Sequence, residues 1–328
     1  MKTIITLEAD LKNKKILFVS TKNLDYIRNT QEIKWLTELS SELKVICSPS
    51  KNYLFRLFYV YINLLPQLKI GSFDTLFIGF APQLLFPFFW LFPKKKLIIF
   101  DFFISFYDTL VDDRKKVSVE SFIARILHYL DKRTIHKADY VVADTKAHGI
   151  YFAEEFDYPK DRITVLYIIA DTSIYHPKPR KPNEKFEVVY FGSILPVQGI
   201  DIVLESIQLL KNNQHIHFTI IGPIKKKFDI QKVDYPNAEF IPWLSQNDLA
   251  KKINQADLAL SGHFSATVGK ADRTIAGKTY IYLAMDKPII LGDSAANHEL
   301  YHDTESIHFV ERGNPKKLAL LIENIADK

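Results

Sequence analysis

Apolar residues follow two patterns that alternate along the chain. Short runs rich in β-branched and aromatic residues predict buried strands, whereas apolar residues spaced three and four apart predict amphipathic helices. In the first half, we expect strands at 15–19, 44–47, 75–78, 97–100, 139–143 and 162–167. The expected helices are 29–43, 53–65, 83–92 and 117–136, the last with Phe122, Ile123, Ile126, Leu127 and Leu130 facing inward.

The alternation pauses at residues 177–184, where three prolines and several charges without an apolar residue indicate a linker. It then resumes, with strands at 187–191, 216–221, 238–241, 258–260, 288–291 and 307–310. The helices expected between and after these strands are 200–211, 246–254, 277–285, 295–302 and 315–326. This order predicts parallel sheets covered on both faces. We expect two doubly wound, Rossmann-like α/β domains at 1–172 and 185–328, joined by 173–184, with ligands in a cleft between them.

The composition limits the class of protein. A net charge of +5 falls short of the basic footprint of a nucleic-acid binder, and no nucleic-acid motif is present. That charge suits an anionic ligand or an anionic membrane surface. The single cysteine, Cys47, excludes a disulfide framework, suits a reducing cytoplasm and follows an apolar run, so we expect a core residue. The N-terminus lacks the long apolar region of a signal peptide.

Two aromatic-rich segments raise the question of membrane contact. Residues 77–92 carry no charge, but they are shorter than the roughly 20 residues that span a bilayer. One interpretation is a buried strand followed by a packed helix. The other is a membrane-surface patch, because aromatic rings are followed at once by Lys94, Lys95 and Lys96. Residues 53–68 allow the same two interpretations.

Glycines and cations follow the strands of the second half. Gly192 and Gly199 bracket a loop between a strand and a helix, which indicates either a phosphate cradle or an ordinary turn. A later loop brings Lys270, Arg273 and Lys278 to the start of the helix at 277–285. Positive charge at a helix N-terminus favours a diphosphate, whereas the alternative is a flexible, solvated basic loop.

The order of these motifs resembles glycosyltransferase family four, a retaining family with the GT-B fold. The resemblance rests on YFGSILPVQGIDIVLESIQLL, FTIIGP, INQADLALS and GKTYIYLAMDKPIILGDSAANHEL, and segments 101–116 and 140–152 look like a bacterial branch. It implies that a sugar is transferred from a nucleotide diphosphate donor with retention at the anomeric carbon. It also implies a donor on the second domain, an acceptor on the first, and neither a metal nor another cofactor. A final helix often returns to the first domain in that family, and Asp327-Lys328 leaves it little room.

The donor motif departs from the family in four places. Ser193 and Gln198 stand where the family has cations, and Ile281 stands where it has a ribose-binding Glu. Arg273 replaces that Glu's partner carboxylate, and with Lys270 and Lys278 it is expected to supply the lost charge. The residues expected to bind the donor are Gly192, Ser193, Gln198, Gly199, Gly222, Lys270, Arg273, Lys278 and Thr279.

The first domain carries carboxylates after the strand at 97–100. We expect Asp108, and next Asp101, to orient the acceptor, with Ser105, Tyr107 and Arg114 as acceptor contacts. The alternative is that Asp101 caps a helix while Asp112 and Asp113 are solvated. Among the histidines, His263 is a candidate for contact with the sugar, and surface positions are expected for His148, His176 and His298.

The sequence thus predicts a cytoplasmic, bacterial glycosyltransferase at the inner membrane face, which extends a lipid-linked or surface polysaccharide. The altered donor motif leaves a non-catalytic GT-B subunit as the alternative, binding a glycan or a partner transferase. A nucleotide-sugar epimerase would need an acid–base pair that the sequence does not indicate.

Overall fold

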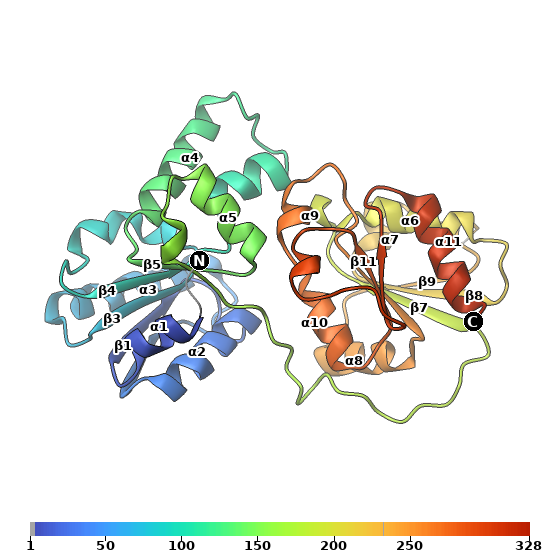
Figure 1. The fold of residues 1–328 in the computed structure, drawn as a ribbon, viewed down its shortest axis with the longest axis horizontal. Helices are drawn as coiled ribbons and strands as arrows, with labels where there is room; N and C mark the ends of the chain where they lie inside the picture. The colour runs from blue at the N-terminus through green and yellow to red at the C-terminus, as the bar shows by residue number, and fades with distance from the viewer. Residues whose placement is uncertain (1–3, 232) are drawn as a thin grey trace. The chain divides into compact units, whose positions relative to one another are not determined.

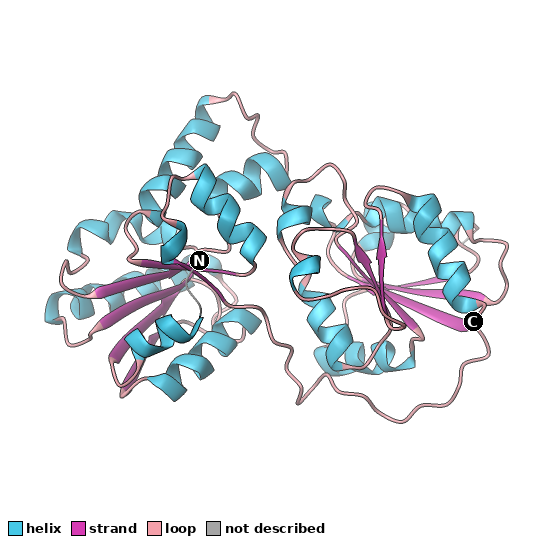
Figure 2. Ribbon diagram, viewed as in Figure 1, coloured by secondary structure: helices cyan, strands magenta, loops and turns pink. Residues whose placement is uncertain are grey.

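The computed structural model describes residues 4–231 and 233–328 and divides into two compact units, Met1–Ile168 and Ile169–Lys328 (Figure 1). Each unit contains one six-stranded sheet with helices on both faces (Figure 2). Every strand pair recorded in the two sheets is parallel. The fold class expected from the alternating pattern, two Rossmann-like α/β domains, is therefore confirmed.

The first sheet has the strand order β2-β1-β3-β4-β5-β6. Its strands are β1 (Lys15–Ser20), β2 (Glu42–Ile46), β3 (Thr75–Phe80), β4 (Leu97–Asp101), β5 (Tyr140–Ala143) and β6 (Ile163–Val165). The central strands β1, β3 and β4 are buried along nearly their whole length. A strand covered on both faces needs apolar side chains on both, which explains the uninterrupted runs in the sequence.

Two layers of helices cover the first sheet. One layer contains α1 (Ile4–Leu11) and α2 (Ile27–Leu39), whose Leu7, Leu11 and Leu36 pack with strand residues. The other layer contains α3 (Tyr53–Ile70), the 3₁₀ helix η1 (Pro82–Leu91), α4 (Phe122–Ile135) and α5 (Lys146–Glu155). Short helical turns, η2 (Asp108–Asp113) and η3 (Lys160–Arg162), lie in the connecting loops.

The second sheet has the order β12-β11-β10-β7-β8-β9. Its strands are β7 (Phe186–Phe191), β8 (Ile216–Ile221), β9 (Ala238–Ile241), β10 (Leu258–Gly262), β11 (Ile289–Gly292) and β12 (Ile307–Val310). The helices α6 (Ile200–Leu209) and α11 (Pro315–Ala326) pack on one face, and α8 (Gln246–Gln255) and α10 (Gly277–Ala284) on the other. Shorter helical turns are η4 (Pro196–Gln198), α7 (Ile224–Lys227), α9 (Lys270–Arg273) and η5 (Asn297–Glu299).

Several sequence-based expectations were wrong or incomplete. The helices α1 and α5 were not predicted, and the helix expected at 295–302 is only the short turn η5. In α4, Phe122, Ile123 and Ile126 point outward rather than inward, with Phe122 74% exposed. The inner side of α4 instead carries small and polar residues, including Ala124 and Asp131. The expectation for Cys47 is confirmed, since it is buried.

Residues 169–185 contain neither helix nor strand. Part of this segment nevertheless packs on the second unit, because Tyr175 belongs to the core beneath α8 and α10. The side chain of Arg180 forms an ion pair with Asp257, and the backbone N–H of Lys178 donates to Asn254. Within the described residues, none of the helices combines the length and the apolar character needed to cross a bilayer.

Candidate anion site

The strand order of the second sheet reverses at β7, which lies between β10 and β8. In open parallel sheets, ligands bind at such a reversal, beyond the carboxyl ends of the strands. The loop that follows β7 and the loop that follows β10 meet there, because the N–H of Phe264 donates to the carbonyl of Gln198 over 3.2 Å. The topology thus places the two glycine-containing loops together.

Close backbone packing explains two of the expected glycines. Gly222 has φ +139°, and a Cβ there would lie 2.2 Å from the carbonyl oxygen of Gly192. Gly199 has φ +64°, and a Cβ there would lie 2.6 Å from the backbone nitrogen of Ser265. Larger residues would separate these loops. Both glycines therefore have a structural role at the edge of the site, whether or not they touch a ligand.

Lys278 lies at the first turn of α10 and is buried, with 5% of its surface exposed. Its Nζ lies 3.7 Å from the centroid of the Tyr190 ring. Among the described residues, this Nζ has no hydrogen-bond partner. Burial lowers the pKa of Lys278 well below its ordinary value. A buried ammonium without a partner is costly, and the ring face compensates for only part of that cost.

The second unit contains a useful contrast in Lys287, which is also buried. Its Nζ donates to the carbonyls of Asn254 and Ala256 over 2.7 and 2.8 Å, at the end of α8. Burial lowers the pKa of Lys287 to about 8. Lys287 therefore closes a helix end, whereas Lys278 has no such structural task.

Neighbouring groups hold α10 in place. The hydroxyls of Thr279 and Ser261 are 2.6 Å apart and buried, which ties α10 to β10. The N–H of Phe191, at the end of β7, donates to the hydroxyl of Tyr282 over 3.1 Å. The first turn of α10 is thus fixed at the strand reversal. The start of α10 together with the Lys278 side chain is therefore the candidate anion site, although the N–H of Thr279 already donates to the carbonyl of Ala276.

The remaining candidates for the donor site lie in the loops that follow β7 and β10. Ser193 and Gln198 are half-buried, and Gln198 Oε1 lies 3.4 Å from the hydroxyl of Tyr190. Lys270 and Arg273 are half-buried on α9, which packs through Ala271 against Val197 of η4. His263 is buried, with Nδ1 3.4 Å from the hydroxyl of Thr274. Donor binding by these residues remains a prediction.

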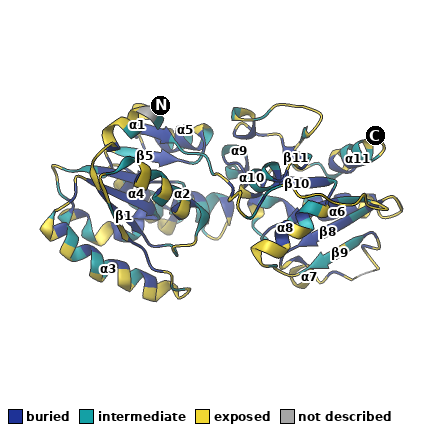
Figure 3. Cartoon of the chain, turned by 90° about the horizontal axis from the view of Figure 1, so that it is seen from below, coloured by how far each residue is buried: buried dark blue, intermediate teal, exposed yellow. Residues whose placement is uncertain are grey.

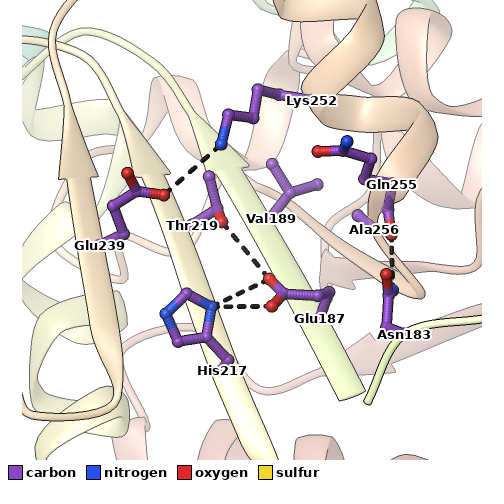
Figure 4. Close-up of a pocket in the computed structure, with 9 residues that line it drawn as sticks. All are labelled: Asn183, Glu187, Val189, His217, Thr219, Glu239, Lys252, Gln255 and Ala256. Carbon is purple, nitrogen blue, oxygen red and sulfur yellow. Dashed lines mark hydrogen bonds and ion pairs between the residues drawn. The ribbon is translucent and has the colours of Figure 1, made fainter. Parts of the chain in front are cut away.

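A polar pocket of about 250 Å³ lies elsewhere on the second sheet (Figure 4). Glu187 accepts from His217 over 2.9 Å and from Thr219 over 3.4 Å. Across the pocket, Lys252 lies 3.5 Å from Glu239. The carboxylates of Glu187 and Glu239 thus have partners, and they lie near the amino-terminal ends of β7 and β9, whereas Lys252 belongs to α8. The pocket therefore lacks the uncompensated charge that marks Lys278.

In the first unit, Asp101 ends β4 and is buried. Arg28 donates to both of its oxygens, from Nε over 2.9 Å and from Nη2 over 2.8 Å. Burial and the nearby Asp101 raise the pKa of Glu32, which lies 3.7 Å from Arg28. Arg28 and Asp101 form a buried ion pair beside Glu32. Asp101 is not a helix cap, and its carboxylate is occupied by this ion pair.

Asp108 is also buried, and it lies 3.6 Å from Nε2 of His148. Nδ1 of the same ring lies 2.7 Å from Asp144. Burial by itself would lower the pKa of His148, but the carboxylates of Asp144 and Asp108 outweigh it and raise the pKa. The expected surface position of His148 is therefore wrong. The residues next to His148 in the sequence gave no indication that its ring would lie buried between two carboxylates.

The loop before Asp108 is anchored by Asp131 of α4. The hydroxyl of Ser105 and the N–H of Tyr107 each donate to Asp131 Oδ2 over 2.7 Å. Asp113 is buried, Asp112 half-buried and Arg114 exposed. The solvated position considered for Asp113 is therefore wrong. Of the other two histidines expected at the surface, His298 is exposed, whereas His176 is half-buried.

Comparison with known proteins identifies the class of the second unit. Residues 185–328 match the family model described as glycosyl transferases group 1. This unit therefore carries a glycosyl transferases group 1 domain. No curated protein matches the chain in sequence.

Solved structures show the same fold over both units. Sucrose-phosphate synthase from Thermosynechococcus elongatus aligns with a TM-score of 0.71 at 9% identity, over 96% of this chain and 90% of that chain. HepE from Anabaena, solved in complex with UDP, aligns with a TM-score of 0.65 at 14% identity, over 95% and 90%. A glycosyltransferase from Rickettsia africae aligns at 0.61 with 14% identity, over 95% and 88%. The chain thus has the two-domain α/β fold of GT-B proteins.

Proposed function

We propose that this protein transfers a sugar from a nucleotide diphosphate donor to a lipid-linked or surface glycan, with retention at the anomeric carbon. The observation that carries the proposal is the buried Lys278 side chain, for which the described part of the chain offers no hydrogen-bond partner, at the strand reversal of a glycosyl transferases group 1 domain. A diphosphate would pair this charge. The bound donor would then offset the part of the burial cost that the Tyr190 ring leaves uncompensated.

The donor diphosphate would lie at the first turn of α10, against Lys278 and the helix N–H groups. Gly192 and Ser193 would form a neutral wall with backbone N–H groups, and Lys270 and Arg273 would add charge. Because cations and the helix dipole neutralise the diphosphate, this mode of binding needs no metal. Uridine diphosphate is the first nucleotide to test, since HepE was solved in complex with UDP.

The acceptor would lie near Asp108, with Ser105, Tyr107 and Arg114 along the same loop. His148 holds Asp108, so the carboxylate could orient an acceptor hydroxyl. Asp101, whose oxygens are occupied by Arg28, supports this loop from β4. In the transfer step, the acceptor oxygen bonds to the anomeric carbon as the bond from that carbon to the diphosphate breaks. The hydroxyl proton passes to the departing diphosphate.

The proposal is tested by nucleotide binding to Lys278→Met, measured by calorimetry and thermal shift. A nucleotide at roughly 100 times its dissociation constant stabilises the wild-type protein by about 2.7 kcal/mol. Losing the charge-assisted bond should weaken binding roughly 10- to 150-fold. The exposed Lys225→Met serves as a matched control and should bind as the wild type does.

Binding by Lys278→Met as tight as wild type would contradict this donor site. Incubation with nucleotide sugars would then separate the enzyme from the non-catalytic alternative, which the residues at 193, 198 and 281 favour. No hydrolysis and no nucleotide binding with any donor would support a non-catalytic subunit. Activity after complete chelation of divalent metals is expected. NMR of the product should show the anomeric configuration of the donor.

A further inference from the structure

The helix α3 is apolar on two opposite sides. Its inner side places Val60, Leu64 and Leu68 in the core of the first unit. Its outer side presents Leu54, Phe58 and Ile62 at intervals of four residues, with 76%, 63% and 52% of their surfaces exposed. Figure 3 shows that exposed stretches recur along α3. A row of large apolar side chains in water indicates a surface that meets something apolar.

The 3₁₀ helix η1 adjoins α3 and adds exposed aromatic side chains of its own. The hydroxyl of Tyr61 donates to the carbonyl of Leu84 over 2.6 Å, and the Tyr61 and Phe88 rings lie 4.7 Å apart. Trp90 of η1 is 80% exposed. We call these exposed side chains of α3 and η1 the outer apolar face: Leu54, Phe55, Phe58, Ile62, Phe86 and Trp90.

Positive charge surrounds the outer apolar face. No acidic residue occurs in 50–73 or 75–100, whereas these segments contain Lys51, Lys69 and the run 94–96. The net charge of +5 lies wholly in residues 1–168, because acidic and basic residues of 169–328 balance. A basic rim around aromatic side chains complements a surface that is anionic outside and apolar within. Two copies of the same basic face would repel each other.

We propose that the outer apolar face docks on an anionic lipid bilayer. The side chains of α3 and Trp90 enter the headgroup boundary, and the lysines meet lipid phosphates. The biological reason for this docking rests on the proposed function, because a lipid-linked acceptor lies in the bilayer. The docking itself requires neither donor nor acceptor, so it can be tested without them.

Sedimentation of the full-length protein with vesicles tests the apolar part. The protein should bind vesicles of phosphatidylcholine with phosphatidylglycerol, bind phosphatidylcholine alone far more weakly, and dissociate as salt rises. The triple variant Leu54→Gln, Phe58→Gln, Ile62→Gln should lose binding to anionic vesicles. The matched control is Leu209→Gln, Leu320→Gln, which changes exposed leucines of α6 and α11 and should bind as wild type.

Two runs of three lysines test the charge. Lys94→Glu, Lys95→Glu should weaken binding to anionic vesicles at least about tenfold. Lys225→Glu, Lys226→Glu in the exposed run of α7 should have no effect. Tryptophan emission should shift to shorter wavelength on binding, and Trp90→Phe should abolish the shift.

Vesicle binding by the triple variant equal to that of wild type would overturn the proposal. The proposal would also be overturned if the wild type formed dimers and the triple variant differed from it only in being monomeric. That result would identify the outer apolar face as a contact between two copies of the chain. Circular dichroism confirms that the variant is folded. Nucleotide binding by the triple variant should be unchanged, so failure of the docking and failure of the donor site are distinguishable.

Discussion

Arg28 in the first unit and Lys278 in the second are both buried, but their charged groups have different surroundings. Arg28 donates from Nε and Nη2, along one edge of its guanidinium, to the two oxygens of Asp101. Lys278 in the second unit has an aromatic ring beneath it and no hydrogen-bond partner among the described residues. A paired buried charge belongs to the fold, whereas an unpaired one is stabilised only by a ligand. Burial by itself therefore does not separate structural from functional charges; pairing does.

The largest effect is expected from breaking the paired cation. Arg28→Met should lower the free energy of unfolding by about 3–5 kcal/mol, because it leaves Asp101 as an uncompensated buried carboxylate. Denaturant unfolding followed by circular dichroism measures this change. A loss below about 1 kcal/mol would mean that the ion pair between Arg28 and Asp101 does not stabilise the fold. It would contradict the structural role assigned to Arg28.

The unpaired cation should respond with the opposite sign. Without ligand, Lys278→Met should raise the free energy of unfolding by about 1–3 kcal/mol, since an unsatisfied buried group is removed. The matched change Lys287→Met should lower it by a similar amount, because two carbonyls lose their donor. Thermal unfolding of both variants measures these two changes. If both substitutions destabilise the protein, Lys278 stabilises the fold as Lys287 does.

The same comparison has a pH dependence. The pKa of Lys278 is lowered by burial, so between that pKa and its ordinary value of 10.5 the unfolded chain binds more protons than the folded one. Wild-type stability should therefore rise with pH in this window, relative to Lys278→Met, which does not titrate there. The advantage of the variant should shrink toward pH 10.5. A constant or growing advantage in unfolding experiments would contradict a lowered pKa.

The smallest effect is expected on the outer side of α4. Ile126→Gln should change the free energy of unfolding by less than about 0.5 kcal/mol, because Ile126 is half exposed. Ile322→Ala in α11, which empties part of the second core, should cost about 2–5 kcal/mol. Equal losses in denaturant unfolding would show that α4 is packed on both sides.

These contrasts show what the sequence could predict. The strands were predictable because both faces of a central parallel strand are apolar, as in β1 and β3. The helices expected at 200–211 and 315–326 are present as α6 and α11, and their Leu204 and Ile322 lie in the core of the second unit. In α4, the apolar period predicted the wrong buried face. A row of apolar residues shows that a helix face is apolar, but it does not show that the protein core covers that face.

The candidate site was predictable only in part. A lysine at the start of a helix after a glycine loop was visible as Lys278, and topology explains why it lies at the strand reversal. The pairing of Arg28 with Asp101 was not predictable, since 73 residues separate them in the chain. Nor was the placement of His148 between Asp144 and Asp108, because α5, which carries His148, and η2, which carries Asp108, meet only in the folded unit.

Asp131 connects two parts of the first unit that have been considered separately. One of its oxygens accepts from Gln83 of η1 over 2.7 Å, and the other holds the loop that leads to Asp108. A single carboxylate thus couples the segment that carries Trp90 to the loop proposed to orient the acceptor. If η1 rests on lipid, Asp131 acts as a spacer that sets the height of Asp108 above the bilayer. That height would select acceptors by how far their reactive hydroxyl stands from the membrane.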